Sequence, residues 1–279
     1  MYDISQKIDK FNLEILIKIK EITDKLKIDY FIVGATVRDI ILNYVYDIII
    51  YRATNDIDFA VRIRNWDEYK LLVGEIEKAG FVKDERIIHR YRYNGMIIDF
   101  IPFGLTKDDV IVWPDKDRQK MNVIGFNDAF VNREDILIQT DPEIVIKAAS
   151  VECLAMLKIF SWNERSIHLR LSDAKDLYLI ITTYLKAGNE ERLFDYPDIV
   201  EQAEDYELSG AILLGRDMSK IISGKVLQSL LDILRDDTLA LLANDMSRYE
   251  LIYRESDDEK REWCEKLLKS LLQGLINKV

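Results

Sequence analysis

The chain has 279 residues, of which 48% are apolar and 32% charged, and its formal net charge is −11. This length suits one large or two modest domains with a sizeable core, and no apolar run approaches the roughly 18 residues that span a bilayer. The acidic balance counts against a general nucleic-acid binder, which usually has a basic surface. It leaves room for a local basic groove and is compatible with a carboxylate site for divalent cations.

The cysteine and histidine content argues against a zinc site. Cys153 and Cys264 lie far apart, and the chain contains only two histidines. This usage is typical of a reducing compartment, so a cytoplasmic location is expected. The N-terminus opens into a charged helical pattern, and neither a secretion signal nor a membrane partner is expected.

Apolar spacing predicts the elements of the first half in chain order. They are a helix over residues 5–27, a buried strand at 30–33 that ends at Gly34, a helix over 36–44, a half-buried strand at 56–63 and a helix over 66–79 that ends at Gly80. Residues 86–93 and 96–103 flank Asn94-Gly95, a strong signal for a two-residue hairpin. A strand at 109–113 follows, and then a helix-poor stretch to about residue 148.

Beyond residue 148 nearly every segment favours helix. Candidate helices cover 151–164, 172–187 and 198–206, followed by a series of helices to the C-terminus, with breaks expected at Gly188, Pro197, Gly210 and Gly224. The sequence therefore predicts an α/β domain over residues 1–148 and a helical domain over residues 149–279.

Three features of the first domain combine into one candidate site. The strand before Gly34 leads into a helix, a turn whose backbone N–H groups can hold phosphates. Asp56 and Asp58 alternate on one strand and so share a face, and Asp99 stands alone in an apolar strand. Such a carboxylate is costly to bury without a partner, and a metal ion is the simplest one. Alone, each feature has a plainer explanation: a turn glycine, a solvent-facing strand edge, or an acceptor of backbone hydrogen bonds.

Several motifs match a known family. They are Val33-Gly34-Ala35-Thr36-Val37-Arg38-Asp39, Asn55-Asp56-Ile57-Asp58-Phe59, Asp99-Phe100-Ile101-Pro102-Phe103-Gly104, Trp113-Pro114, Leu157-Lys158-Ile159-Phe160-Ser161-Trp162 and Lys175-Asp176-Leu177. Over about residues 28–185 the chain resembles the polymerase-β-like nucleotidyltransferases, and especially the AbiEii-type toxins of abortive-infection and type IV toxin–antitoxin systems. The resemblance implies a nucleotidyltransferase domain with a mixed sheet, followed by an all-helical C-terminal domain.

The resemblance also implies a role for each matching residue. Gly34 and Ala35 would form the phosphate loop, Asp56 and Asp58 would bind two Mg²⁺ ions, Asp99 would be a third ligand or base, Lys158 would contact the nucleotide phosphates, and Asp176 would assist catalysis or nucleotide positioning. Two departures bear on substrate choice. Ala35 lacks the hydroxyl of the usual residue, and residues 44–53 lengthen the link to the Asp-x-Asp strand.

The basic candidates have structural alternatives. Lys158, Trp162 and Arg165 share one helical face, where the first and last could bind nucleotide or could be a snorkelling lysine and a solvated arginine; Trp162 is expected to pack. Arg38 could reach a phosphate or pair with Asp39 or Asp56.

Residues 86–92 form the densest basic patch. Strand alternation would place Arg90 and Arg92 on one face and His89 and Tyr91 on the other. Cations interleaved with an aromatic ring suit single-stranded RNA, so this patch is a candidate acceptor-binding strip. An ordinary exposed hairpin arm explains it equally well.

The expected reaction is Mg²⁺-dependent transfer of NMP from an NTP to a hydroxyl. By analogy with toxins of this type, the acceptor would be a tRNA 3′ end and the partner a winged-helix antitoxin. Two alternatives stay open: nucleotidylation of a protein or small molecule, and a non-catalytic nucleotide-binding module. The three acids Asp56, Asp58 and Asp99 argue against the module, because it needs no metal chemistry.

Overall fold

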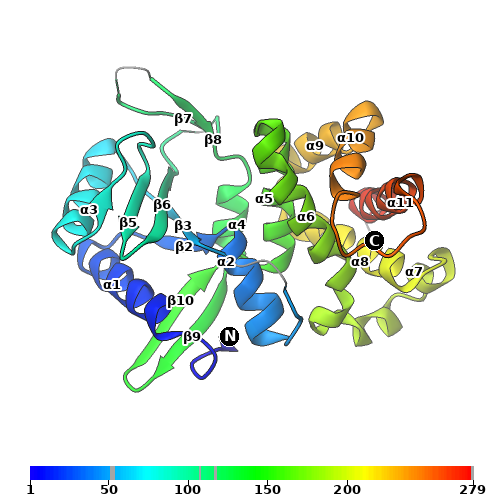
Figure 1. Cartoon of the computed structure of the whole chain (residues 1–279), viewed down its shortest axis with the longest axis horizontal. Helices are drawn as coiled ribbons and strands as arrows, with labels where there is room; N and C mark the ends of the chain where they lie inside the picture. Colours follow the sequence, from blue (N-terminus) through cyan, green and yellow to red (C-terminus); the bar gives the residue numbers. More distant parts are fainter. Residues whose placement is uncertain (51–53, 107, 116–117, 278–279) are drawn as a thin grey trace. The chain divides into compact units, whose positions relative to one another are not determined.

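A computed structural model describes residues 1–50, 54–106, 108–115 and 118–277. The chain divides into two compact units, Met1–Ser150 and Val151–Val279. The first is a mixed α/β unit and the second is helical (Figure 1), as the sequence predicts. Residues 51–53, at the end of the long link noted above, lie outside the described residues.

An eight-stranded mixed sheet forms the frame of the first unit. Its order is β1-β9-β10-β2-β3-β6-β5-β4, with parallel pairing of β1 with β9, of β10 with β2 and of β3 with β6. The strands are β1 (Tyr2–Asp3), β2 (Tyr30–Val33), β3 (Asp56–Arg62), β4 (Val82–Lys83), β5 (Arg90–Tyr93), β6 (Met96–Phe103), β9 (Glu134–Thr140) and β10 (Glu143–Ala148). A separate two-stranded sheet pairs β7 (Val110–Val112) with β8 (Lys120–Asn122).

The centre of the sheet follows the apolar pattern of the sequence. All four residues of β2 are buried, and Phe59 of β3 and Phe100 of β6 are fully buried and stack on each other. The hairpin of β5 and β6 turns at Asn94 and Gly95, which have φ of 47° and 91°, because a two-residue hairpin turn of this kind needs positive φ at both positions.

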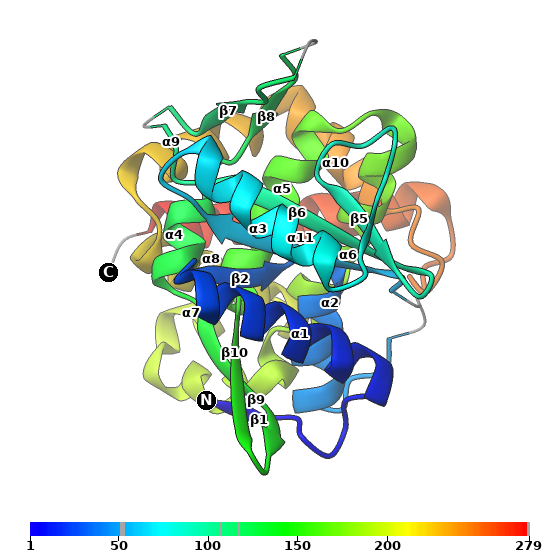
Figure 2. The same ribbon diagram turned by 90° about the vertical axis from the view of Figure 1, so that its left-hand side faces the viewer.

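The helices of this unit that the described residues form are α1 (Lys10–Leu26), α2 (Ala35–Arg38), the π-helix η1 (Asp39–Val45), α3 (Trp66–Lys78) and α4 (Phe126–Val131). Asp9 caps α1 and Asn65 caps α3, each accepting two backbone N–H groups. In Figure 2, α1 and α3 lie on the same face of the sheet, and the two helices contact each other. The helix expected over 36–44 is thus α2 continued by a π-helix, and α4 interrupts the stretch that was expected to lack helix.

The second unit contains α5 (Val151–Glu164), α6 (Ile167–Thr183), η2 (Leu185–Asn189), η3 (Glu191–Asp195), α7 (Pro197–Gln202), α8 (Tyr206–Ile221), α9 (Gly224–Ile233), α10 (Asp236–Met246) and α11 (Asp257–Ile276). The expected break at Gly210 is wrong, since Gly210 is a buried residue inside α8. The chain does break at Gly188, where φ is 80°.

Two glycines allow α8 and α11 to pack backbone against backbone. A Cβ on Gly215 would overlap the carbonyl oxygen of Leu271, and one on Gly274 would overlap that of Ile212. The close approach buries Leu267, Leu271 and their neighbours. Among the described residues, none of the helices has the length and apolar character needed to cross a bilayer.

Candidate active site

Gly34 joins β2 to α2 and lies against the Asp58 carboxylate. Its φ of 77° and ψ of −159° belong to a region that is essentially restricted to glycine. A Cβ at this position would overlap Oδ2 of Asp58. The residue is therefore more than a turn glycine: conformation and the approach of the carboxylate both require it.

The sheet register brings the predicted carboxylates to one place. Asp56 and Asp58 alternate on β3 and so share a face. Asp58 lies directly opposite Asp99 of the parallel strand β6. Asp56 and Asp58 are half-buried, whereas Asp99 is 5% exposed. The register thus brings Asp99, about forty residues further along the chain, next to the Asp56 and Asp58 pair.

Asp99 has a cation of the protein itself as its partner. Arg90 donates from Nε to Oδ1 at 2.8 Å and from Nη2 to Oδ2 at 2.7 Å, a bidentate pair. The hydrogen bond with Asp99 raises the pKa of Arg90, and the charges of Asp99, Asp58 and Asp56 act in the same direction against burial. Arg90 is thus the partner that the structure shows for the buried Asp99 carboxylate, and the role of Asp99 as a metal ligand stays a prediction.

The donor set fits a hard divalent cation in its chemistry. Carboxylate oxygens on a rigid strand are what Mg²⁺ takes in proteins, and the glycine leaves Asp58 room to approach the turn. No group of three or more His, Cys, Asp or Glu side chains within residues 1–50, 54–106, 108–115 and 118–277 is arranged to hold a metal ion. Both carboxylate oxygens of Asp99 accept hydrogen bonds from the guanidinium of Arg90.

The helix after Gly34 anchors itself to the start of β3. Thr36 Oγ1 donates to the carbonyl oxygen of Asp56 at 2.6 Å. Arg38, 1% exposed, donates from Nε to Asp39 Oδ1 at 2.8 Å and from Nη2 to Thr54 Oγ1 at 3.1 Å. Of the alternatives that the sequence left open for Arg38, the structure shows the pair with Asp39.

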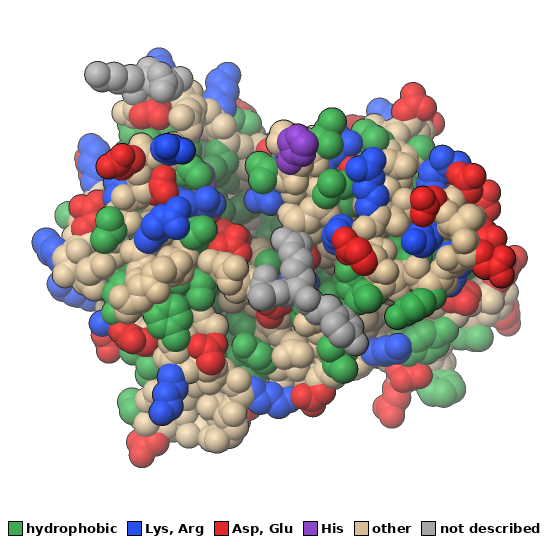
Figure 3. Space-filling view, in the orientation of Figure 1, with side chains coloured by type: hydrophobic (Ala, Val, Ile, Leu, Met, Phe, Trp, Pro, Cys, Tyr) green, Lys and Arg blue, Asp and Glu red, His purple; other side chains and the backbone are tan. Residues whose placement is uncertain are grey.

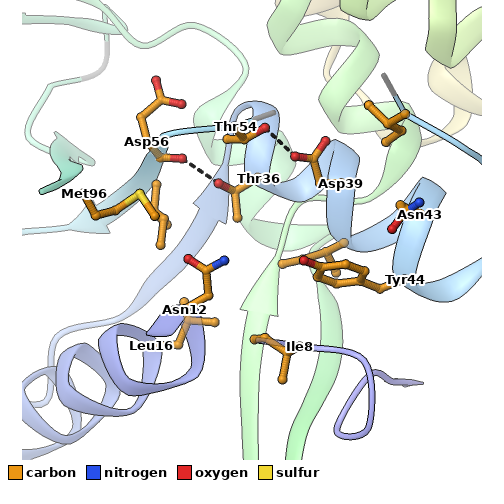
Figure 4. Close-up of a pocket in the computed structure, with 13 residues that line it drawn as sticks. Ile8, Asn12, Leu16, Thr36, Asp39, Asn43, Tyr44, Thr54, Asp56 and Met96 are labelled. Atoms are coloured by element: carbon orange, nitrogen blue, oxygen red, sulfur yellow. Dashed lines mark hydrogen bonds between the residues drawn. The ribbon is translucent and has the colours of Figure 1, made fainter. Parts of the chain in front are cut away.

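A pocket of about 440 Å³ lies beside this anchor, between the first half of α1 and the η1 helix. Figure 4 shows the Asn12 amide pointing into it, while the Asp56 carboxylate points away. Asn12 Oδ1 is buried without a hydrogen-bond partner among the described residues. None of the described residues that line the pocket is Lys or Arg.

The predicted acceptor strip divides into different environments. Tyr91 is 1% exposed and packs on Phe100, so it belongs to the core. His89 precedes β5 instead of alternating with it, stacks on Trp113 and places Nε2 3.8 Å from Asp99 Oδ2. Arg86 and Arg92 are exposed, and Arg92 pairs with Asp84 at 3.3 Å. The expected division of faces is therefore wrong for His89.

The face of the molecule in Figure 3 has no continuous basic patch among the described residues. Its Lys and Arg side chains are interspersed with acidic ones. A basic stripe is the usual footprint of a protein that binds nucleic acid through its phosphates. Any acceptor contact on this face would therefore involve few cations.

The candidates of the second unit form their own cluster. Lys158 of α5 is buried and lies 2.9 Å from Asp173 Oδ1 and 2.7 Å from Asp176 Oδ2 of α6. Burial opposes its charge, but Asp176 and Asp173 outweigh this and raise the pKa of Lys158. Arg165 lies 2.9 Å from Asp173 as well. Trp162 is buried and donates to Asp245. The roles of Lys158, Arg165 and Asp176 toward a nucleotide stay predictions.

Sequence reasoning missed two partners in these clusters: Arg90 as the counter-ion of Asp99, and Asp173 as the acid shared by Lys158 and Arg165. One of them had a signal. In a hairpin with a two-residue turn at 94–95, residue 90 must lie opposite residue 99, as the register confirms. Asp173, three residues before Asp176, gave no comparable signal.

Solved structures similar to this chain are transferases of two kinds. The alignment with the solution structure of the antibiotic-resistance factor ANT(2'')-Ia covers 70% of this chain and 97% of the ANT(2'')-Ia chain, at 13% sequence identity and a TM-score of 0.40. The crystal structure of ANT(2")-Ia in complex with adenylyl-2"-tobramycin covers 66% and 99%, at 14% identity and a TM-score of 0.40. The Thermotoga maritima CCA-adding enzyme complexed with tRNA covers 98% and 82%, at 12% identity and a TM-score of 0.27.

The family assignment comes from the sequence. No curated protein matches the chain significantly. The family described as "Nucleotidyl transferase AbiEii toxin, Type IV TA system" matches residues 22–239, well over half of the chain and including every predicted site residue. The chain belongs to this family of AbiEii nucleotidyltransferase toxins.

Proposed function

We propose that this nucleotidyltransferase transfers NMP from an NTP to the 3′ hydroxyl of a tRNA, with two Mg²⁺ ions held at Asp56, Asp58 and Asp99. The observation that carries the proposal is the register of β3 and β6, which sets Asp58 opposite Asp99 with Gly34 against the Asp58 carboxylate. Membership of the toxin family supports the tRNA acceptor and a winged-helix antitoxin as the partner.

The reaction requires one bond to form and one to break at the α-phosphorus. The acceptor oxygen bonds to this phosphorus, the bond to the β-phosphate oxygen breaks, and pyrophosphate leaves with the electron pair. Mg²⁺ bound at these carboxylates would align the α-phosphate and stabilise the leaving group. Asp99 would accept the proton of the attacking hydroxyl.

The chain's own residues set the geometry of this step. Gly34 keeps the turn next to Asp58 free of a side chain, and the Thr36 hydroxyl ties the following helix to the start of β3. Both features fix the carboxylates on rigid elements, and such fixed geometry is what transfer by positioning demands.

Incubating the full chain with each α-labelled NTP, Mg²⁺ and either total tRNA or cell lysate tests the acceptor. The proposal expects label on untreated tRNA and none on tRNA that was oxidised with periodate before the reaction, because periodate converts the terminal 2′,3′-diol to a dialdehyde and leaves no 3′ hydroxyl to attack. Label on protein or on a small molecule, with none on tRNA, would overturn the tRNA acceptor while leaving nucleotidyl transfer intact.

A further inference from the structure

Arg90 and Asp99 are cross-strand partners at the edge of the carboxylate group. They lie directly opposite each other in the antiparallel pair of β5 and β6. Both guanidinium–carboxylate distances, 2.8 Å and 2.7 Å, are those of a charge-assisted hydrogen bond. The planar fork of arginine matches the two oxygens of one carboxylate, so the pair has a defined geometry.

The guanidinium lies within the field of the whole carboxylate group. Asp99, the partner of Arg90 across β5 and β6, lies directly opposite Asp58 in the register of β3 and β6, and Asp56 is two residues from Asp58 on the same strand. A cation bound by these acids would therefore lie close to a fixed positive charge. Two like charges a few ångströms apart repel each other, so Arg90 and a metal ion oppose each other.

Burial of Asp99 explains why a counter-ion is needed when no metal is bound. Its side chain is 7% exposed, whereas that of Arg90 is 24% exposed. A buried carboxylate without a partner is strongly destabilising. Arg90, by contrast, has a long side chain with access to solvent. Water can solvate its guanidinium after it leaves Asp99, whereas the buried Asp99 carboxylate needs another cation in its place.

We propose that Arg90 is a positioning residue that exchanges with the divalent cation at Asp99. In the metal-free protein it holds the third carboxylate in register with Asp58, and metal binding displaces its guanidinium. The inference rests on the proposed function, because it takes Asp99 as a ligand. The new element is that the Arg90 guanidinium occupies the Asp99 carboxylate until a divalent cation displaces it.

Binding of Mn²⁺ alone to the full nucleotide-free chain, measured by calorimetry, tests the exchange. Arg90→Gln is expected to bind Mn²⁺ about tenfold more tightly than the wild type or better, because a positive charge is gone. Arg92→Gln is the matched control: it lies on the same strand, is 51% exposed and pairs with Asp84, and its Mn²⁺ affinity should equal that of the wild type.

Thermal unfolding supplies a second readout that is independent of activity. Metal-free Arg90→Gln should melt at a lower temperature than the wild type, since Asp99 has lost its counter-ion, and Mn²⁺ should raise its Tm by more than it raises that of the wild type. If Arg90→Gln fails to fold, Arg90→Lys, which keeps the charge but loses the fork, should bind Mn²⁺ more tightly than the wild type by a smaller factor.

The outcomes separate this inference from the proposed function. Equal Mn²⁺ affinity in the wild type and the Arg90 variants, abolished by Asp58→Asn, would overturn the exchange alone. Absence of Mn²⁺ binding in all of these proteins would contradict the metal-dependent function and the exchange together.

Discussion

Each unit of the molecule contains a buried acid paired with a cation, and the two pairs differ in how tightly they are enclosed. In the first unit, Asp99 pairs with Arg90, whose side chain is 24% exposed. In the second, Lys158 is 9% exposed and lies between two acids that are only 1% and 3% exposed, Asp173 and Asp176. The cation of the first pair, Arg90, thus reaches solvent, whereas Lys158 and both of its acids are buried.

The difference separates an exchangeable ion pair from a structural one. Arg90 can give up Asp99 to another cation, because its guanidinium gains solvent when it leaves. Lys158 has no such exchange open to it, since moving away would break its ion pairs with two buried carboxylates, of which Asp173 would keep Arg165 as a cation. A contact of Lys158 with nucleotide phosphates would require both of its ion pairs to break. The enclosed cluster is better suited to holding α5 against α6.

The largest expected effect is on the stability of the enclosed cluster. Lys158→Met leaves Asp173 and Asp176 buried and should lower the free energy of unfolding by about 3–5 kcal/mol, measured by urea denaturation. Arg165→Met is the control: its side chain is 48% exposed, and its loss should cost about 1 kcal/mol at most. Wild-type stability with abolished transfer in Lys158→Met would instead assign Lys158 to the nucleotide.

Gly34→Ala should affect activity more than stability. The new Cβ would overlap Asp58 Oδ2, and a displacement of about 1 Å in a catalytic group can cost about 10²-fold in rate. Gly95→Ala is the matched control, because Gly95 also has positive φ but has no atom within 4 Å of its Cβ position. Equal rates of NMP transfer in the two variants would mean that the approach of Asp58 to the turn is unimportant.

The smallest effect on stability is expected at the ion pairs of Glu75, which are more exposed than those of Asp99 and of Lys158. Hydrogen bonds from Lys25 of α1 and Lys78 of α3 lower the pKa of Glu75 to about 2. A depressed carboxylate pKa stabilises the folded state above the unfolded value of 4.5, and this contribution is lost as the pH falls through about 2.

Unfolding by urea at several pH values measures this contribution. Glu75→Gln should be slightly less stable than the wild type at pH 7, and the difference should vanish by pH 2. A difference that is the same at both pH values would show that the ion pairs of Glu75 contribute nothing to stability.

Local patterns in the sequence predicted most of the frame. The strands at 30–33 and 96–103 and the helix at 151–164 have the bounds expected, because apolar spacing and a two-residue turn are local signals. The sequence predicts a break at Gly210 that α8 does not have, because a glycine that fits against Leu185 inside a helix resembles, in sequence, one that ends a helix.

The site was predictable in its members but less so in its arrangement. The order of Gly34, Asp56, Asp58 and Asp99 was visible, whereas the parallel register that sets Asp58 beside Asp99 joins strands about forty residues apart. No local pattern fixes such a register. The counter-ion Arg90 follows from the turn at Asn94 and Gly95, yet alternation alone assigned it to a solvent-facing strip.

The central claim is that the carboxylates of β3 and β6 carry NMP transfer. Its most direct test is the single-turnover transfer of α-labelled NMP by the wild type, by Asp58→Asn and by Asp67→Asn, whose side chain is 85% exposed on α3. The account predicts that Asp58→Asn retains its fold and loses transfer by about 10²-fold or more, while Asp67→Asn matches the wild type. Equal transfer by Asp58→Asn and the wild type would contradict it.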